Sequence, residues 1–187
     1  MTILTSRFEQ ALIYATRLHS QQTRKVTGVP YISHLLSVTA LVLEAGGNEE
    51  EAIAALLHDA VEDQGGATTR AEIYDQFGEQ IVAIVDDCTE FKSEIKPPWR
   101  ERKLHYIEQL RVASPSARRV ALADKLHNMR ALLFDYRQQG EAIWSLFSTD
   151  KEGILWFYHT LLKMYREVAP SPMVEELARV VAELEQL

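Results

Sequence analysis

The residues best suited to chemistry in this 187-residue chain follow a short apolar segment. An apolar run over residues 54–57 leads directly into His58-Asp59, and Glu62-Asp63 come one helical turn later. On a helix, His58 and Glu62 lie on one face at i and i+4. Asp59 and Asp63 form a second stripe beside them. Three carboxylates and an imidazole are costly to gather unless they face water or a metal ion, so the segment predicts either a polar helix end or part of a metal site.

Two other segments place a histidine and an aspartate where they could join this group. His34 falls in the first turn of a predicted helix, and Asp124 lies inside another, directly after an apolar stretch. Taken singly, His34 is typical of a capping or core histidine, and Asp124 of one half of a surface ion pair. Taken with His58 and Asp59, they supply two imidazoles and two carboxylates from three helices, which suits a hard-to-borderline divalent cation. The set contains no thiolate, so it differs from closed structural zinc sites and would leave positions open for water and a phosphoryl oxygen.

Three motifs in this order resemble the hydrolase domain of the RelA/SpoT family, a branch of the HD phosphohydrolase superfamily. They are RKVTGVPYISH (residues 24–34), HDAVED (58–63) and ADKLHNMR (123–130). The resemblance covers about residues 6–165. In that family the domain removes the 3′-pyrophosphate of guanosine penta- and tetraphosphate alarmones. Because the chain ends soon after this segment, it is similar to the small alarmone hydrolases that stand alone, and residues 1–187 are expected to form one HD-type domain.

The resemblance implies a role for each group in these motifs. The implied ligands of one manganese ion are His34, His58, Asp59 and Asp124. Glu62 and Asp63 are implied to activate and orient the attacking water, which agrees with their place one turn beyond the ligands. The implied substrate contacts are Arg24, Lys25, Asn128 and Lys151. Of these, the Arg24-Lys25 loop would pack on the guanine base, because a planar guanidinium can stack and hydrogen-bond, and the other two would lie near the ribose and phosphates.

One segment departs from the pattern of the family. In relatives, the stretch corresponding to residues 91–103 lies beside the cleft and supplies a lysine that faces the phosphates. Here the stretch differs and carries Trp99. Lys96, Arg100 or Arg102 could substitute for that lysine, and the choice between them stays open.

The function implied by the resemblance is metal-dependent hydrolysis of guanosine alarmones, which releases pyrophosphate and GDP or GTP. Adenine alarmones stay open as substrates, because a stacking loop reads purine shape better than guanine edges. One alternative is an HD-type phosphohydrolase of another nucleotide, such as a 5′-nucleotidase or a nucleoside triphosphate hydrolase. An inactive alarmone-binding module is a second alternative. The presence of every expected ligand and of both acidic residues disfavours the inactive module.

Several other polar residues are predicted to be structural or exposed and to take no part in the chemistry. The histidines without ligand-like neighbours are His19, His105 and His159. His127 follows Asp124 by three residues, so it either supports the metal site or simply packs. The Arg118-Arg119 pair is predicted to lie on a solvated face.

Composition limits the class of protein and its partners. Hydrophobic residues make up 47% and charged residues 25%, and a chain of this length buries enough surface to fold without disulfides. The net charge of −7 argues against a nucleic-acid partner, which would require a basic excess. No apolar run approaches the length of a membrane span, and no signal peptide is recognised. The single Cys88 fits a reducing compartment, so we expect a cytoplasmic monomer or homodimer.

The elements that must position the site are predicted to be helices. Only eight glycines and six prolines interrupt the chain, and apolar residues recur at helical spacing, which predicts an all-α bundle of about eight to ten helices. Asn48 and Ser114-Pro115 have the form of helix starts, and Thr69 to Glu72 has that of a capping box. The predicted helices span residues 6–22, 33–44, 48–63, 69–77, 79–90, 100–112, 114–138, 142–167 and 171–187. Loops are predicted over residues 23–32 and 91–99.

Overall fold

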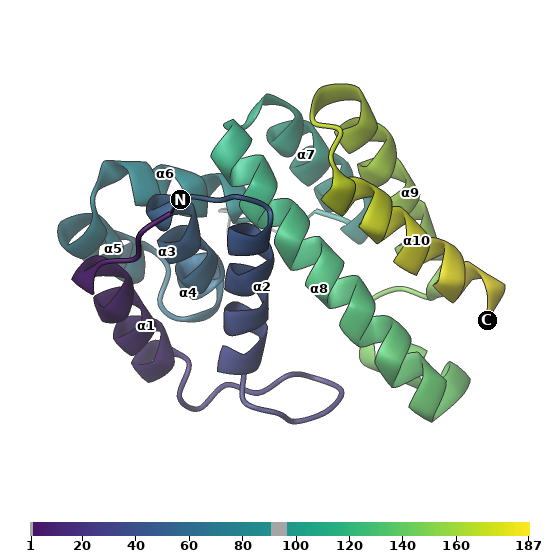
Figure 1. The fold of residues 1–187 in the computed structure, drawn as a ribbon. Coiled ribbons are helices and arrows are strands. Elements are labelled where there is room, and N and C mark those ends of the chain that lie inside the picture. The colour runs from purple at the N-terminus through teal and green to yellow at the C-terminus, as the bar shows by residue number, and fades with distance from the viewer. Residues whose placement is uncertain (1, 91–96) are drawn as a thin grey trace.

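The computed structural model describes residues 2–90 and 97–187, and within these ranges the chain is mainly helical (Figure 1). The elements are α1 (Ser6–Leu18), α2 (Ile32–Glu44), α3 (Glu49–Leu57), α4 (Ala60–Asp63), α5 (Ala67–Phe77), α6 (Glu79–Cys88), α7 (Trp99–Val112), α8 (Pro115–Gln139), the 3₁₀ helix η1 (Gly140–Leu146), α9 (Lys151–Val168) and α10 (Pro172–Gln186). Among the described residues, β-type pairing is limited to one isolated bridge between Thr23 and Pro30. The predicted all-α bundle is confirmed.

Polar caps begin three of the helices where the sequence predicts them. The Asn48 side chain accepts a hydrogen bond from the Glu51 amide at 2.9 Å, and the Glu51 carboxylate accepts one from the Asn48 amide at 2.8 Å. Ser114 caps α8, which has Pro115 at its first position, and Ser171 caps α10 in the same way. These caps satisfy amide groups that have no partner inside the helix.

The predicted helix over residues 48–63 is divided in the structure. α3 ends at Leu57, His58 and Asp59 form a turn, and α4 begins at Ala60. The periodicity of side chains was right on both sides of this turn, but a two-residue interruption leaves no trace in a hydrophobic pattern. The consequence is that His58 and Asp59 lie at a bend instead of on a continuous helix.

Three other predicted helix ends were wrong for local reasons. The first helix ends at Leu18, and residues 19–21 form turns after it. The helix predicted over 142–167 begins only at Lys151, because the Asp150 carboxylate accepts from the Gly153 amide and caps it. The predicted capping box at Thr69 does not form, since the Thr69 hydroxyl donates to the Gln64 carbonyl at 2.8 Å and α5 begins two residues earlier.

Two central helices hold the molecule together. α3 packs against α1, α2, α6 and α8, and its residues from Ala52 to Leu57 have no solvent exposure. α8 crosses the middle of the molecule, with α1 to α6 on one side and α7, α9 and α10 on the other (Figure 1). The core is continuous and includes residues from Ala11 to Leu184. The two elements that carry His58 and Asp124 are therefore among the most firmly packed in the fold.

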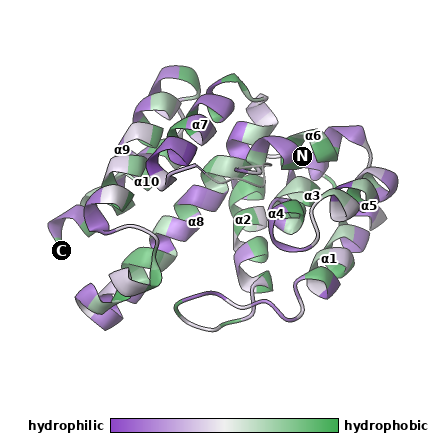
Figure 2. Ribbon diagram, turned by 180° about the vertical axis from the view of Figure 1, so that it is seen from behind, coloured by the Kyte–Doolittle hydropathy of each residue, from purple (hydrophilic) through white to green (hydrophobic). Residues whose placement is uncertain are grey.

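The surface of the bundle is polar in the way expected of packed amphipathic helices. Figure 2 shows hydrophilic and hydrophobic residues interspersed along most helices, as expected when each helix buries one face. In the described part of the chain, no helix combines the length and the apolar character needed to cross a membrane.

The Arg118-Arg119 pair does not lie on a solvated face as predicted. Arg119 forms an ion pair with Glu51, whose side chain is almost fully buried. Arg118 is half-buried and donates to the Arg111 carbonyl at 3.2 Å. The fold places these charges between helices because α8 packs along both α2 and α10.

Candidate metal centre and active site

Four of the predicted site residues converge where α2, the α3–α4 turn and α8 meet. The Nε2 atom of His34 lies 3.2 Å from Oδ1 of Asp124 and 3.5 Å from Oδ2 of Asp59. The Nε2 atom of His58 lies 3.0 Å from Oδ2 of Asp59 and 3.6 Å from Oδ1 of Asp124. We call these four residues the His/Asp cluster. Its members come from segments far apart in the sequence, and only the packing of the three helices brings them together.

Both imidazoles of the His/Asp cluster turn Nε2 toward the carboxylates. Nδ1 of His58 donates to the carbonyl oxygen of Ala55 at 2.8 Å, which leaves the lone pair on Nε2. Nδ1 of His34 lies 2.7 Å from Nδ1 of His127, and donation by His34 in this pair leaves its Nε2 free as well. Both Nε2 atoms are buried and have no hydrogen-bond partner among the described residues. Buried lone pairs that face carboxylates are what a cation needs, so the donor set fits a divalent metal ion.

The electrostatics of the cluster also favour a positive charge at its centre. Burial opposes protonation of His58, but the carboxylates of Asp59 and Asp124 outweigh it and raise the pKa of His58 well above its ordinary value. Burial acts to raise the pKa of both carboxylates, yet His58 beside Asp59, and Lys125 beside Asp124, hold these pKa values below the ordinary range. A divalent ion would supply this positive charge in place of protons on the imidazoles.

The bend between α3 and α4 decides where Asp59 points. Asp59 is the N-cap residue of α4, but its side chain makes no capping hydrogen bond. Its Oδ2 atom faces the imidazoles and accepts a hydrogen bond from the Tyr31 hydroxyl at 2.6 Å. Tyr31 was not among the predicted site residues, although it lies within the first motif. Its role depends on the folded loop, which the pattern of residue types does not describe.

Glu62 and Asp63 lie on α4 next to the His/Asp cluster, with part of each side chain exposed. Nearby protein atoms desolvate both carboxyls and raise their pKa values, and the negative charge of Asp59 raises them further. Within the described residues, neither carboxylate forms an ion pair. Both groups therefore have lone pairs available to water beside the cluster.

A hydrogen-bonded chain fixes the orientation of Asp63. Its Oδ2 atom accepts from Nε2 of Gln22 at 2.7 Å. The side-chain Oε1 atom of Gln22 lies 2.6 Å from Nδ1 of the buried His19 and accepts a hydrogen bond from Nε2 of Gln64 at 2.5 Å. Gln22 was not among the predicted site residues, because its partners Asp63 and Gln64 lie 41 and 42 positions away in the sequence.

Asn128 joins the loop that carries Arg24 and Lys25 to the His/Asp cluster. An Nη atom of Arg24 donates to Oδ1 of Asn128 at 2.9 Å, and Nδ2 of Asn128 donates to Oδ1 of Asp124 at 2.5 Å. The Arg24 guanidinium lies 5.8 Å from the centre of the Tyr31 ring. Lys25 is exposed on the same loop.

The predicted phosphate-binding cations are only partly brought to the site. Lys151 lies at the first position of α9, and its Nζ is 5.6 Å from the centre of the Tyr136 ring. Arg100 stacks on Trp156 with its Cζ 4.0 Å from the ring centre. The predicted candidate Lys96 lies outside the described residues.

Glu90 engages two cations of α7 beside Glu62. Lys103 Nζ is 2.6 Å and Arg102 Nη1 3.7 Å from the Glu90 carboxylate, and the Glu90 amide lies 3.4 Å from Glu62. Lys103 was not among the predicted candidates, because a lysine inside a charged helix resembles any surface residue. Burial acts to raise the pKa of the Glu90 carboxyl, but the charge of Lys103 outweighs burial and lowers it.

Comparison with known proteins agrees with this arrangement. A family model described as an HD domain matches residues 11–155. The human guanosine-3′,5′-bis(diphosphate) 3′-pyrophosphohydrolase MESH1 is 40% identical over 126 residues, which are 66% of this chain and 68% of that protein. A guanosine-3′,5′-bis(diphosphate) 3′-pyrophosphohydrolase of Aquifex aeolicus is 37% identical over 129 residues, 66% of this chain but 17% of the longer protein.

Solved structures show the same relationship across the chain. A metazoan ortholog of SpoT, described as hydrolysing ppGpp and acting in starvation responses, superposes with a TM-score of 0.79 at 26% identity and 100% coverage of both chains. A Listeria monocytogenes protein superposes with a TM-score of 0.71 at 32% identity, covering 82% of this chain and 99% of that one. Sequence, fold and the clustered histidines and aspartates agree, and the chain belongs to the HD-domain family, among relatives of the SpoT-type hydrolases.

Proposed function

We propose that this protein hydrolyses guanosine 3′,5′-bis(diphosphate) and guanosine pentaphosphate at the 3′ position, releasing pyrophosphate and GDP or GTP. The observation that carries the proposal is the His/Asp cluster, whose two buried Nε2 atoms face two carboxylates. Relatives with 37% to 40% identity bear the name of this activity. The reaction adds water across the bond between the 3′ oxygen and its phosphorus.

A divalent metal ion fits the His/Asp cluster, and we assign it as manganese. His34, His58, Asp59 and Asp124 would hold it. The ion would polarise a phosphoryl oxygen and lower the pKa of bound water. Neutral imidazoles suit it, and the hydrogen bond from Nδ1 of His58 to the Ala55 carbonyl favours the tautomer that binds through Nε2.

Glu62 and Asp63 are the proposed catalytic carboxylates. Each carries lone pairs beside the cluster and can accept a proton from water or orient it. The Gln22 amide holds Asp63 in one orientation by donating to Oδ2. Because burial and Asp59 raise the pKa of both carboxyls, either one is a stronger base than an exposed carboxylate.

The substrate would lie between the first loop and α8. Arg24 and Lys25 pack on the purine, and Asn128, which touches both Arg24 and Asp124, contacts the ribose. Lys151 and one of the cations of residues 96–103 would contact the phosphates, which a protein with a net charge of −7 must neutralise locally. A loop that stacks on a purine also accommodates adenine alarmones.

The decisive experiment incubates the purified protein with manganese and a panel of nucleotides, then identifies the products. Guanosine 3′,5′-bis(diphosphate) should give intact pyrophosphate and GDP, and chelator should stop the reaction. Phosphate released from 5′-monophosphates, or triphosphate cleavage without alarmone cleavage, would favour the other HD-type phosphohydrolases. Alarmone binding without any product would identify an inactive binding module.

We also propose how the protein acts in its biological setting. The protein acts as a single domain, in the cytoplasm, as a monomer or homodimer. The continuous core from Ala11 to Leu184 supports the single domain. Limited proteolysis and sedimentation would test the first and the last.

A further inference from the structure

A cavity lies on the opposite side of α8 from the His/Asp cluster. It has a volume of about 780 Å³ and lies between α2, α8 and the turn that joins α9 to α10. Leu122 and Leu126 line it, and both are two residues from Asp124. Because residues two apart on a helix point to roughly opposite sides, α8 separates this cavity from the metal centre. The volume falls in the range of about 300–1,000 Å³ that is typical of small-molecule sites.

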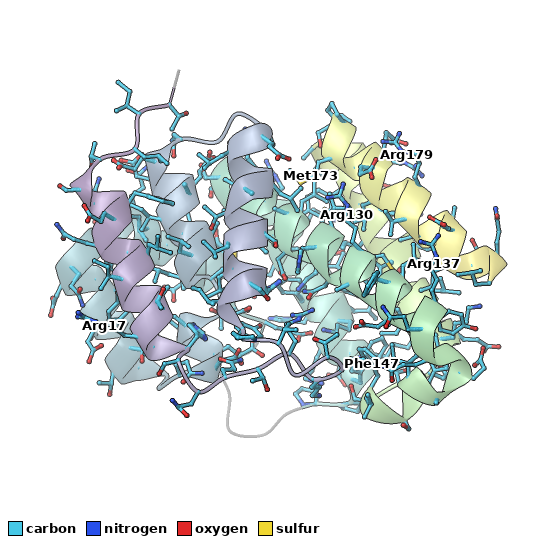
Figure 3. The ribbon with its side chains drawn as sticks, turned by 60° about the horizontal axis from the view of Figure 1, so that its bottom comes forward. Arg17, Arg130, Arg137, Phe147, Met173 and Arg179 are labelled. Atoms are coloured by element: carbon cyan, nitrogen blue, oxygen red, sulfur yellow. The ribbon has the colours of Figure 1, made fainter. Side chains whose placement is uncertain are left out.

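Three arginines of α8 line this cavity, and two of them are already paired. Arg119 forms an ion pair with Glu51, and Arg130 with Glu176 at 3.1 Å. In Figure 3, Arg130 and Met173 lie in the region where α2 faces α8 and α10. These pairs neutralise two of the arginines, and the exposed carboxylate of Glu44 lies on the rim among apolar neighbours.

Arg118 is the third arginine, and its charge has no such partner. Nη1 of Arg118 donates to the Arg111 carbonyl at 3.2 Å, while its Nε is buried and meets no acceptor within residues 2–90 and 97–187. No carboxylate of the described residues forms an ion pair with it. A guanidinium offers five donors, and a buried donor without an acceptor is rare in folded proteins. Arg118 is therefore a half-buried guanidinium at the wall of an apolar cavity, and no carboxylate of the described residues balances its charge.

We propose that this cavity binds a small amphipathic anion, with a carboxylate or phosphate head group on Arg118 and an apolar body against Leu41, Leu122 and Met173. The planar guanidinium matches both head groups, because each offers two oxygens to parallel N–H donors. The partly exposed walls formed by Leu41 and Met173 give the apolar body an entrance. The site is independent of the proposed hydrolytic centre.

The test uses 8-anilinonaphthalene-1-sulfonate, an amphipathic anion whose fluorescence rises in apolar surroundings. The wild-type protein should bind it saturably, and Arg118→Gln should weaken binding about tenfold or more, as loss of a charge-assisted contact implies. Met173→Glu, which places a negative charge in the wall at a position favourable for a helix N-terminus, should weaken it similarly. Arg137→Gln, an exposed ion-paired arginine of the same helix, is the matched control and should bind like wild type.

Displacement then identifies the ligand chemistry. Decanoate and decyl phosphate compete with the dye, and the stronger competitor shows whether a carboxylate or a phosphate is preferred. The proposal is overturned if both variants, with wild-type melting temperatures, bind the dye normally, if GDP displaces it, or if neither decyl compound does. Because no readout uses hydrolysis, these outcomes are separate from failure of the proposed function.

Discussion

Arg24 and Asn128 are 104 residues apart in the chain, yet the Arg24 guanidinium donates to the Asn128 side chain at 2.9 Å. The same Asn128 donates to Asp124 of the His/Asp cluster. The proposed purine loop and the proposed metal centre are thus joined by a single amide. Loss of the Asn128 side chain would remove a hydrogen-bond partner from Arg24 and from Asp124 together.

This link predicts that Arg24 and Asn128 are energetically coupled. Arg24→Ala should raise KM about 5- to 30-fold with a smaller change in kcat, because stacking persists in the ground and transition states. Asn128→Ala should raise KM further, because this variant removes both the hydrogen bond that holds Arg24 and the proposed contact of Asn128 with the ribose. In the double variant, KM should rise by less than the product of the two single-variant increases, which corresponds to a coupling energy of about 0.5–3 kcal/mol. Arg17→Ala, an exposed arginine of α1 labelled in Figure 3, is the control; strict additivity would contradict the link.

Metal binding is expected to depend on Asp59, whose Oδ2 atom faces both histidines of the His/Asp cluster. Asp59→Ala should abolish high-affinity manganese binding, measured by calorimetry on metal-free protein, together with turnover. Affinity in the wild type should fall in acid, because imidazoles must be neutral to bind. Asp75→Ala, an exposed aspartate of α5, should bind manganese normally. Wild-type affinity in Asp59→Ala would remove Asp59 from the ligand set.

Glu62 and Asp63 should separate catalysis from metal binding. Glu62→Gln and Asp63→Asn are expected to keep manganese while kcat falls by about 10²–10⁴, the usual contribution of a general acid or base. Single-turnover kinetics and calorimetry on the same samples give both quantities. A change below about threefold in both variants would exclude the proposed role, and loss of metal in either would make that residue a ligand.

Gln22 should act as a positioning residue for Asp63. Gln22→Ala removes the 2.7 Å hydrogen bond to Oδ2, so kcat should fall about tenfold while KM changes little. Gln22→Glu should be worse, because it replaces a donor with a like charge. The exposed neighbour variant Gln21→Ala should behave as wild type. Equal losses in kcat for Gln21→Ala and Gln22→Ala would show a general effect of the loop.

The buried Asp135 carboxyl, outside the His/Asp cluster, is expected to make the stability of the fold depend on pH. Burial raises its pKa although the Arg24 charge opposes this, so the ionised form costs stability at neutral pH. A raised carboxyl pKa means that this cost disappears as pH falls through the folded-state pKa. Asp135→Asn should therefore melt higher than wild type at pH 7 and match it near pH 3, below the ordinary Asp pKa of about 3.9. A lower melting temperature at pH 7 would show that the carboxylate is stabilising.

Sequence patterns were sufficient for the helical class and for the four members of the His/Asp cluster. The Asn48 capping box and the Ser114-Pro115 start were predicted correctly because their hydrogen bonds join residues within one turn. The three motifs gave His34, His58, Asp59 and Asp124 because residue type and order are local information. Local information failed at the bend between Leu57 and Ala60, where tertiary packing overrides helical periodicity.

The sequence by itself determined which side chains could bind a metal ion and which segments would be helical. Only the tertiary structure decided which partners orient them: Tyr31 on Asp59, His127 on His34 and Gln22 on Asp63. Each of these hydrogen bonds joins residues 28 or more positions apart, so no window of sequence contains both ends. The same reason applies to Arg118, whose place beside the cavity depends on residues of α2, α8 and α10 that are far apart in the sequence. Donor types are fixed by the chain, but their distances are fixed by packing.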